Sequence, residues 1–186
     1  MQVAEYLPKF LKKHKIINFL ILSKLQKKLI KLKFNGNSYN FISLADPEPR
    51  NVFIHEVFEL DFFKIAKNFM SENGTFFDIG ANVGFCTFGL VSSRPKASFH
   101  LFEANIKLIN LLNLSKGLHA NNKISINHCC IGNTAGTSFF KVREDQSGQS
   151  HVSRTVENLQ VPNCMLDIYC EEQKISTVDF AKIDIE

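Results

Sequence analysis

The stretch "TFFDIGANVGFCTFGL", residues 75–90, decides the fold of this chain. A β-branched and aromatic run ends at an acid, Asp78, and two glycines follow, Gly80 and Gly84. Beyond the second glycine, apolar residues recur at helical spacing. This order predicts a buried strand, then a tight turn, then a helix.

The same alternation continues toward the end of the chain and predicts an α/β fold. Strands are expected over residues 75–79, 98–103, 124–130 and 178–186, and helices over residues 83–92, 105–117 and 165–173. A β-α-β-α-β order gives a parallel sheet with right-handed crossovers. An added antiparallel strand is expected over residues 137–142, followed by a polar loop over residues 143–153.

The segment before the opening stretch predicts a hairpin and one helix. Alternating apolar residues in 31–43 flank an Asn-Gly pair, which favours a two-residue hairpin turn. Two prolines predict a loop over residues 45–50. Apolar residues at helical spacing predict a helix over residues 51–70, which "SENG" (71–74) would end.

The net charge of +4 belongs to an N-terminal arm. Residues 1–35 hold nine lysines and one acid, a net of +8, whereas the remainder has 13 basic and 17 acidic residues, a net of −4. A nucleic-acid-binding fold is therefore not indicated. Residues 9–32 predict one or two basic amphipathic helices, for which we favour packing on the body, with peripheral membrane contact as the alternative.

The five cysteines predict neither a disulfide framework nor a metal site. Their number is odd, and no C-x-x-C pair occurs among them. Free thiols of this kind fit a reducing compartment, so the expected location is cytoplasmic. The longest apolar run of the arm, residues 16–22, is too short to cross a bilayer.

The spacing of the glycines in the turn distinguishes between two kinds of ligand. A dinucleotide fingerprint reads G-x-G-x-x-G, whereas this turn reads D-x-G-x-x-x-G and lacks the glycine that admits a diphosphate. A nicotinamide-dependent oxidoreductase is therefore disfavoured. Asp78 would repel a diphosphate but suits a ligand that carries an ammonium group. Glu103 ends the next strand and would accept hydrogen bonds from ribose hydroxyls, the alternative being that it caps the following helix.

The chain resembles the FkbM family of S-adenosylmethionine-dependent methyltransferases. The resemblance rests on "FFDIGANVGFCTF", "FHLFEAN", "CCIGNTAGTSFF", "SGQSHV", "MLDIYCEE" and "VDFAKIDIE", which follow one another between residues 75 and 186. It implies the class I methyltransferase (Rossmann-like) sheet and O-methylation of hydroxyls on carbohydrates, glycolipids or related natural products. The acceptor would be a small molecule or a glycan.

The resemblance also implies that seven residues bind the cofactor: Asp78, Gly80, Asn82, Gly84, Glu103, Cys130 and Ile131. The first four would line its methionine end, Glu103 would hold the ribose, and the last two would lie near the adenine. Many class I enzymes have an acidic or amide residue where this chain has Cys130.

The terminal K-I-D-x-E implies the catalytic groups. A sugar hydroxyl is a weak nucleophile, so a base within reach helps its methylation. Asp184 and Glu186 are the candidates, with Asp184 first, and the alternative is that both are structural polar residues at a strand end. His151, in the polar loop, is a remote alternative.

The expected organisation has three parts: an arm (1–33), a hairpin and helix (34–74), and an FkbM-type domain (75–186). Family members continue beyond the strand on which this sequence ends, so we expect a C-terminally incomplete sheet. The leading hypothesis is a methyltransferase. The alternative is a truncated, non-catalytic cofactor-binding remnant or interaction module.

Overall fold

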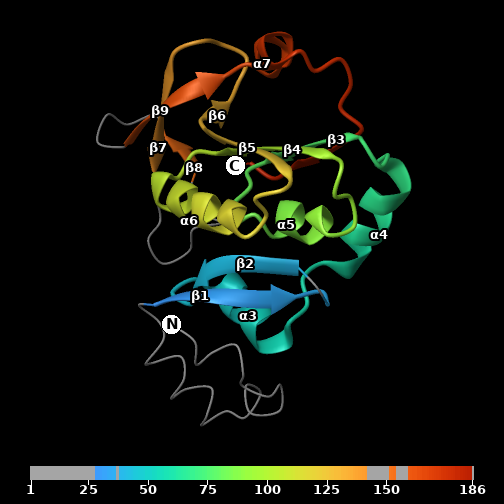
Figure 1. Ribbon diagram of the computed structural model, residues 1–186. Coiled ribbons are helices and arrows are strands. Elements are labelled where there is room, and N and C mark those ends of the chain that lie inside the picture. Colours follow the sequence, from blue (N-terminus) through green and yellow to red (C-terminus); the bar gives the residue numbers. More distant parts are fainter. Residues whose placement is uncertain (1–27, 37, 142–150, 154–158, 186) are drawn as a thin grey trace.

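At the centre of the fold is a four-stranded parallel sheet in the order β10-β3-β4-β5 (Figure 1). The computed structural model describes residues 28–36, 38–141, 151–153 and 159–185. The strands are β3 (Thr75–Ile79), β4 (Ser98–Glu103), β5 (Lys123–His128) and β10 (Phe180–Ile183). The α/β class and the parallel sheet predicted from the sequence are confirmed.

Helices cover both faces of this sheet (Figure 1). On one face lie α5 (Phe85–Val91) and α6 (Ile106–Gly117), and on the other lies α7 (Leu166–Gln173). Successive side chains of β3 alternate between the two cores: Phe76 packs with the α5–α6 side, and Phe77 packs with Tyr169 of α7. A strand buried on both faces reads as a continuous apolar run, which is how the sequence presents it.

A hairpin packs beneath α5 and α6, as Figure 1 shows. It consists of β1 (Leu29–Phe34) and β2 (Ser38–Ser43), so the predicted hairpin is confirmed. Three positions rather than two separate the paired strands, because Phe34 pairs with Ser38. The helix expected through residue 32 is wrong from Leu29 onward, since the apolar residues there recur every second position and face the core.

The single helix predicted over residues 51–70 is wrong. The structure has two helices, α3 (Pro47–His55) and α4 (Leu60–Phe69), separated at Glu56 and Glu59, whose backbones are left-handed with φ of 58° and 30°. The loop predicted over residues 45–50 is also wrong, because α3 begins at Pro47. Proline is favourable in a first helical turn, where its missing N–H would have no partner.

A second sheet has the order β6-β9-β7-β8. It contains β6 (Cys130–Ile131), β7 (Thr137–Lys141), β8 (His151–Ser153) and β9 (Leu159–Cys164). The antiparallel strand predicted after residue 136 is confirmed as β7. The strand predicted over 124–130 is divided between β5 and β6, and β9 was not predicted, because Pro162 lies within it.

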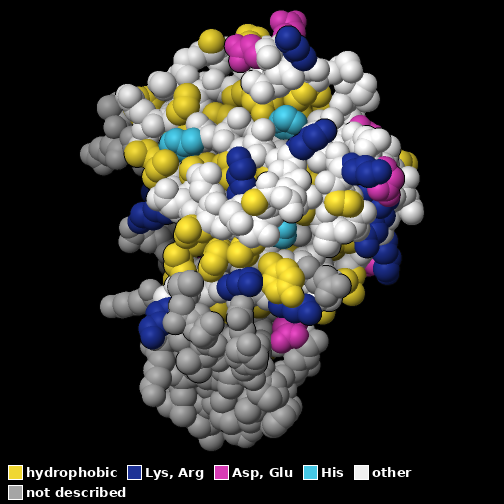
Figure 2. Space-filling model, viewed as in Figure 1, with side chains coloured by type: hydrophobic (Ala, Val, Ile, Leu, Met, Phe, Trp, Pro, Cys, Tyr) yellow, Lys and Arg dark blue, Asp and Glu magenta, His cyan; other side chains and the backbone are white. Residues whose placement is uncertain are grey.

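One hydrophobic core joins the hairpin, α3 and α4 to the central sheet. It extends from Ile30 in β1 through Phe53 and Phe63 to Phe99 in β4 and Ile124 in β5. On the outer side of the hairpin, the ammonium groups of Lys31 and Lys33 lie 5.1 and 5.8 Å from the centre of the Tyr39 ring. Figure 2 shows hydrophobic and basic side chains together in this region.

Residues 1–27 of the arm lie outside the described part of the chain, as do residues 142–150 of the polar loop. The proposed division into arm, leading segment and domain stays a prediction. Among the residues that are described, no helix has the length and apolarity needed to cross a membrane.

Candidate functional site

The glycine turn begins where β3 ends. Gly80 has a φ of +74°, a conformation that favours glycine, and its N–H donates to the carbonyl of Phe102 at 3.0 Å. A Cβ atom at this position would collide with the backbone carbonyl of Asp184. Gly84 has a φ of +81°, and a Cβ there would meet Phe88 at 2.6 Å and Leu112 at 2.8 Å. Both positions therefore require glycine for conformation and for space.

Asp78 lies behind this turn, fully buried. Its Oδ2 accepts hydrogen bonds from the hydroxyl of Thr87 at 2.7 Å and from the backbone N–H of Thr87 at 3.3 Å. Its Oδ1 accepts no hydrogen bond from any described residue and lies 3.7 Å from the ammonium of Lys182. Burial raises the pKa of Asp78, while Lys182 and Thr87 act in the opposite direction. The sequence predicted that this carboxylate lines the methionine end of the cofactor, and that role stays a prediction.

Lys182 holds three groups together at the end of β10. The parallel register pairs it with Asp78, and its ammonium donates to the carbonyl of Gly80 at 2.7 Å and lies 3.3 Å from Oδ2 of Asp184. Burial alone would lower the pKa of Lys182, but Asp78, Cys86 and Asp184 together raise it above its usual value. A protonated Lys182 thus fixes the turn to the neighbouring strand.

Glu103 joins two loops at the end of β4. Its Oε2 accepts from the backbone N–H of Asn82 at 2.7 Å, and its Oε1 accepts from that of Asn105 at 2.8 Å. Burial raises the pKa of Glu103, and these two N–H donors oppose the shift. The side chain of Asn105 caps α6, and Glu103 binds the backbone of this cap residue instead of capping the helix itself. The ribose contact of Glu103 stays a prediction.

Cys130 and Ile131 form β6, close to this carboxylate. Cys130 is buried with Ala104, Phe140 and Val161, and Ile131 packs on the core that contains Tyr169. Burial raises the pKa of the Cys130 thiol, and the negative charge of Glu103 raises it further. The thiol is therefore uncharged at neutral pH, and the adenine contact proposed for these two residues stays a prediction.

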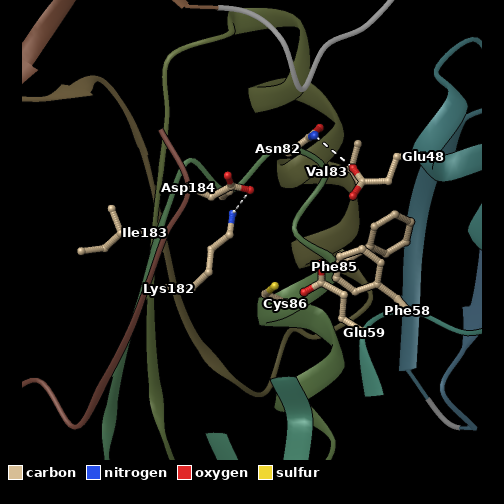
Figure 3. Close-up of a pocket in the computed structure, with 11 residues that line it drawn as sticks. Glu48, Phe58, Glu59, Asn82, Val83, Phe85, Cys86, Lys182, Ile183 and Asp184 are labelled. Carbon is tan, nitrogen blue, oxygen red and sulfur yellow. Dashed lines mark hydrogen bonds and ion pairs between the residues drawn. The ribbon is translucent and has the colours of Figure 1, made fainter. Parts of the chain in front are cut away.

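A pocket of about 330 Å³ opens beside the glycine turn (Figure 3). Its walls come from α3, the α3–α4 connection, the turn before α5, the first turn of α5, and the end of β10. The lining residues are Glu48, Phe58, Glu59, Ala81, Asn82, Val83, Phe85, Cys86, Lys182, Ile183 and Asp184. Of the residues predicted from the sequence, this pocket brings Asn82 and Asp184 together.

The pocket is acidic. Three carboxylates, Glu48, Glu59 and Asp184, line it against one ammonium, that of Lys182. Burial raises the pKa of Glu48; Lys182 lowers it, and Glu59 and Asp184 raise it further. Cys86 is no nucleophile here, because burial and the charge of Asp78 raise the pKa of its thiol. A net negative cavity favours a ligand with a positive group.

Of the two candidate bases, Asp184 and Glu186, the structure describes the first. Asp184 lies at the pocket with its side chain 79% exposed, whereas Glu186 is outside the described residues. The side chain of His151 is likewise outside them.

Sequence reasoning assigned no role at the site to nine of the eleven lining residues: Glu48, Phe58, Glu59, Ala81, Val83, Phe85, Cys86, Lys182 and Ile183. Lys182 was part of the quoted K-I-D-x-E motif but had no assigned role, although a lysine two residues before a candidate base was a usable signal. Glu48 lies between two prolines in a segment that reads as a loop, and nothing in its spacing marks it.

Comparisons with known proteins point to one family. Residues 78–186, more than half of the chain, match the family model described as the methyltransferase FkbM domain. A crystal structure described as "putative transferase PH0793" from Pyrococcus horikoshii is similar at 14% identity, with a TM-score of 0.44. That similarity covers 64% of this chain and 48% of the other, so it spans about half of that protein's length. A search of curated proteins gave no match.

Proposed function

Because this chain belongs to the methyltransferase FkbM family, we propose that it uses S-adenosylmethionine to methylate a hydroxyl. The acceptor would be a carbohydrate, a glycolipid or a related natural product. The observation that carries the proposal is the acidic pocket beside the glycine turn. S-adenosylmethionine carries two positive groups, a sulfonium and an ammonium, and a cavity with three carboxylates and one ammonium suits it.

The glycine turn supports the same cofactor. The position at Gly80 lets the chain approach β10 without a Cβ atom. Glu103, at the end of β4, is the residue that we propose for the ribose hydroxyls; it is buried and accepts backbone N–H groups from Asn82 and Asn105. When bound, S-adenosylmethionine supplies an electrophilic methyl group carried on a positively charged sulfur.

Asp184 is the proposed general base. Its exposed carboxylate lies at the pocket where an acceptor hydroxyl could reach it, and Lys182 is 3.3 Å away. In this role it would take the proton that the acceptor hydroxyl loses. Positioning of the hydroxyl would supply a further part of the rate.

The test measures cofactor binding and methyl transfer separately. Calorimetry gives the affinity for S-adenosylmethionine, and mass spectrometry follows a labelled methyl group into a panel of oligosaccharides and glycolipids. We expect Asp184→Asn to lower turnover by about 10²- to 10⁴-fold, the range of general-base catalysis. The affinity for S-adenosylmethionine should fall much less, because Glu48 and Glu59 keep the pocket acidic. Glu171→Gln, an exposed change on α7, serves as the matched control.

The possible outcomes separate the proposed functions. Absence of S-adenosylmethionine binding would overturn the proposal. Binding without transfer to any acceptor would favour the cofactor-binding module named above. Full turnover by Asp184→Asn would leave the proposed methyltransferase activity standing, but it would show that Asp184 is not the general base.

A further inference from the structure

Part of the acidic pocket is built by residues that precede the family-matched region. Glu48 lies in α3, and Phe58 and Glu59 lie in the connection between α3 and α4, whereas the family match begins at residue 78. Figure 3 shows Glu48 facing the turn that carries Asn82 and Val83, across from Lys182 and Asp184. The leading segment thus contributes directly to the ligand site.

Asp78, the acid of the glycine turn, is poorly placed to touch a ligand in this pocket. Its side chain is fully buried, and it is not among the lining residues. Thr87 donates to one carboxylate oxygen, and Lys182, which lines the pocket, lies 3.7 Å from the other. Within the described residues that second oxygen accepts no hydrogen bond, and the ion pair with Lys182 is its contact on the pocket side.

Glu48, unlike Asp78, lines the pocket and can contact a ligand there. Its Oε2 accepts a hydrogen bond from the side-chain amide of Asn82 at 3.2 Å, which holds the carboxylate against the glycine turn. Among the described residues, no donor is bonded to its other oxygen. Phe58 and Phe85 pack on each other in the wall of the same pocket, with ring centres 4.8 Å apart. A carboxylate oxygen in a pocket that also has an aromatic surface is a favourable site for an ammonium group.

We propose that Glu48 binds the ammonium group at the amino-acid end of S-adenosylmethionine, with Asn82 holding the carboxylate in place. This inference rests on the proposed function. It assigns recognition of the cofactor to a residue of the leading segment. The role of Asp78 is then to pair with Lys182 and hold its ammonium in place.

The experiment compares three nucleosides by calorimetry. S-adenosylmethionine carries the ammonium and the sulfonium, S-adenosylhomocysteine carries the ammonium with a neutral sulfur, and 5′-methylthioadenosine lacks the amino-acid end. The variant is Glu48→Gln, which keeps the shape of the side chain and removes its charge. Glu171→Gln is the control, and thermal unfolding of each variant checks that the fold is retained.

We expect Glu48→Gln to weaken both S-adenosylmethionine and S-adenosylhomocysteine by about 10- to 100-fold, the effect of losing a charged hydrogen bond. Binding of 5′-methylthioadenosine should not change. Equal weakening of all three nucleosides, or of none, would overturn the inference and leave the proposed function standing. Weakening of S-adenosylmethionine alone would also overturn it, since Glu48 would then recognise the sulfonium. If the unmodified chain binds none of the three, both proposals fail.

Discussion

Lys182 is the residue on which the geometry of the candidate site depends. Its ammonium contacts the Gly80 carbonyl, the buried Asp78 carboxylate and Asp184, and its side chain is only 18% exposed. Removing one partner of a buried ion pair leaves the other charge without compensation. We therefore expect Lys182→Met to lower the free energy of unfolding by about 3–5 kcal/mol near neutral pH, as measured by urea denaturation.

The pH dependence of this loss follows from Asp78. Burial already raises the pKa of this carboxyl, and loss of Lys182 raises it further, so the native state holds its proton to a higher pH than the unfolded state does. The free energy of unfolding then falls as the pH rises from the pKa of Asp78 in the unfolded state to its pKa in the native state. The loss in Lys182→Met should be larger at about pH 8 than at about pH 5. Lys123→Met, at an exposed lysine, is the control, and an equal loss at both pH values would contradict this account.

At the residue scale, the sequence indicated the backbone of the site better than its side-chain contacts. Positive φ at Gly80 follows from glycine at the end of a strand, and it is observed. The partners of Asp78 depend on the register between β3 and β10, strands about a hundred residues apart, and no local pattern reveals that register. Glu48 reaches the pocket only because α3 packs against the turn, which is again a tertiary effect.

At the element scale, Tyr169 adds hydrogen bonds to the apolar contacts that hold α7 on the sheet. The Tyr169 hydroxyl lies 2.8 Å from Nδ1 of His100 and accepts a hydrogen bond from the side chain of Asn127 at 3.2 Å. In Tyr169→Phe both partners lose a hydrogen bond at the face of the sheet. We expect a loss of about 1–2 kcal/mol in the free energy of unfolding, with faster hydrogen exchange in α7.

Tyr39→Phe is the matched control for this prediction. The Tyr39 ring lies on the outer face of the hairpin, and its hydroxyl makes no hydrogen bond within the described residues. Loss of the Tyr39 hydroxyl should change the free energy of unfolding by less than about 0.5 kcal/mol. Equal effects of the two substitutions would show that the Tyr169 hydroxyl does not hold α7.

Helices and strands with regularly spaced apolar residues could be predicted from the sequence. Those whose bounds depend on one or two individual residues could not. The strands β3 and β4 and the helix α6 lie within one or two residues of their expected bounds. The break between α3 and α4 depends on left-handed Glu56 and Glu59, and glutamate gives no signal for that conformation. Strand β9 pairs on both sides with β6 and β7, although Pro162 argues locally against a strand.

At the scale of the whole molecule, Asn40 connects the hairpin to the central sheet's helices. Its fully buried side chain donates to the carbonyl of Val83 at 2.7 Å and accepts from the hydroxyl of Ser115 in α6. Asn40→Ala would leave both groups without their partner. We expect a loss of about 2–4 kcal/mol, because two buried polar groups become unsatisfied.

The measurement for Asn40→Ala also tests cooperativity. The chain has no Trp and three Tyr, so tyrosine fluorescence and far-UV circular dichroism are suitable independent probes of urea unfolding. One shared core predicts that both probes follow a single transition and that Asn40→Ala shifts it as a whole. A separate early transition for the hairpin would contradict this. Asn122→Ala, at an exposed hydrogen bond, is the control.

The contact between Lys182 and the Gly80 carbonyl spans 102 residues and has a consequence for synthesis on the ribosome. The turn and α5 emerge early, but the lysine that secures the turn, and the pocket wall formed by residues 182–184, emerge much later. A nascent chain therefore exposes the edge of β3 before any ligand site exists. A ligand of this pocket would give no protection to the growing polypeptide, and it could stabilise the chain only once β10 has left the exit tunnel.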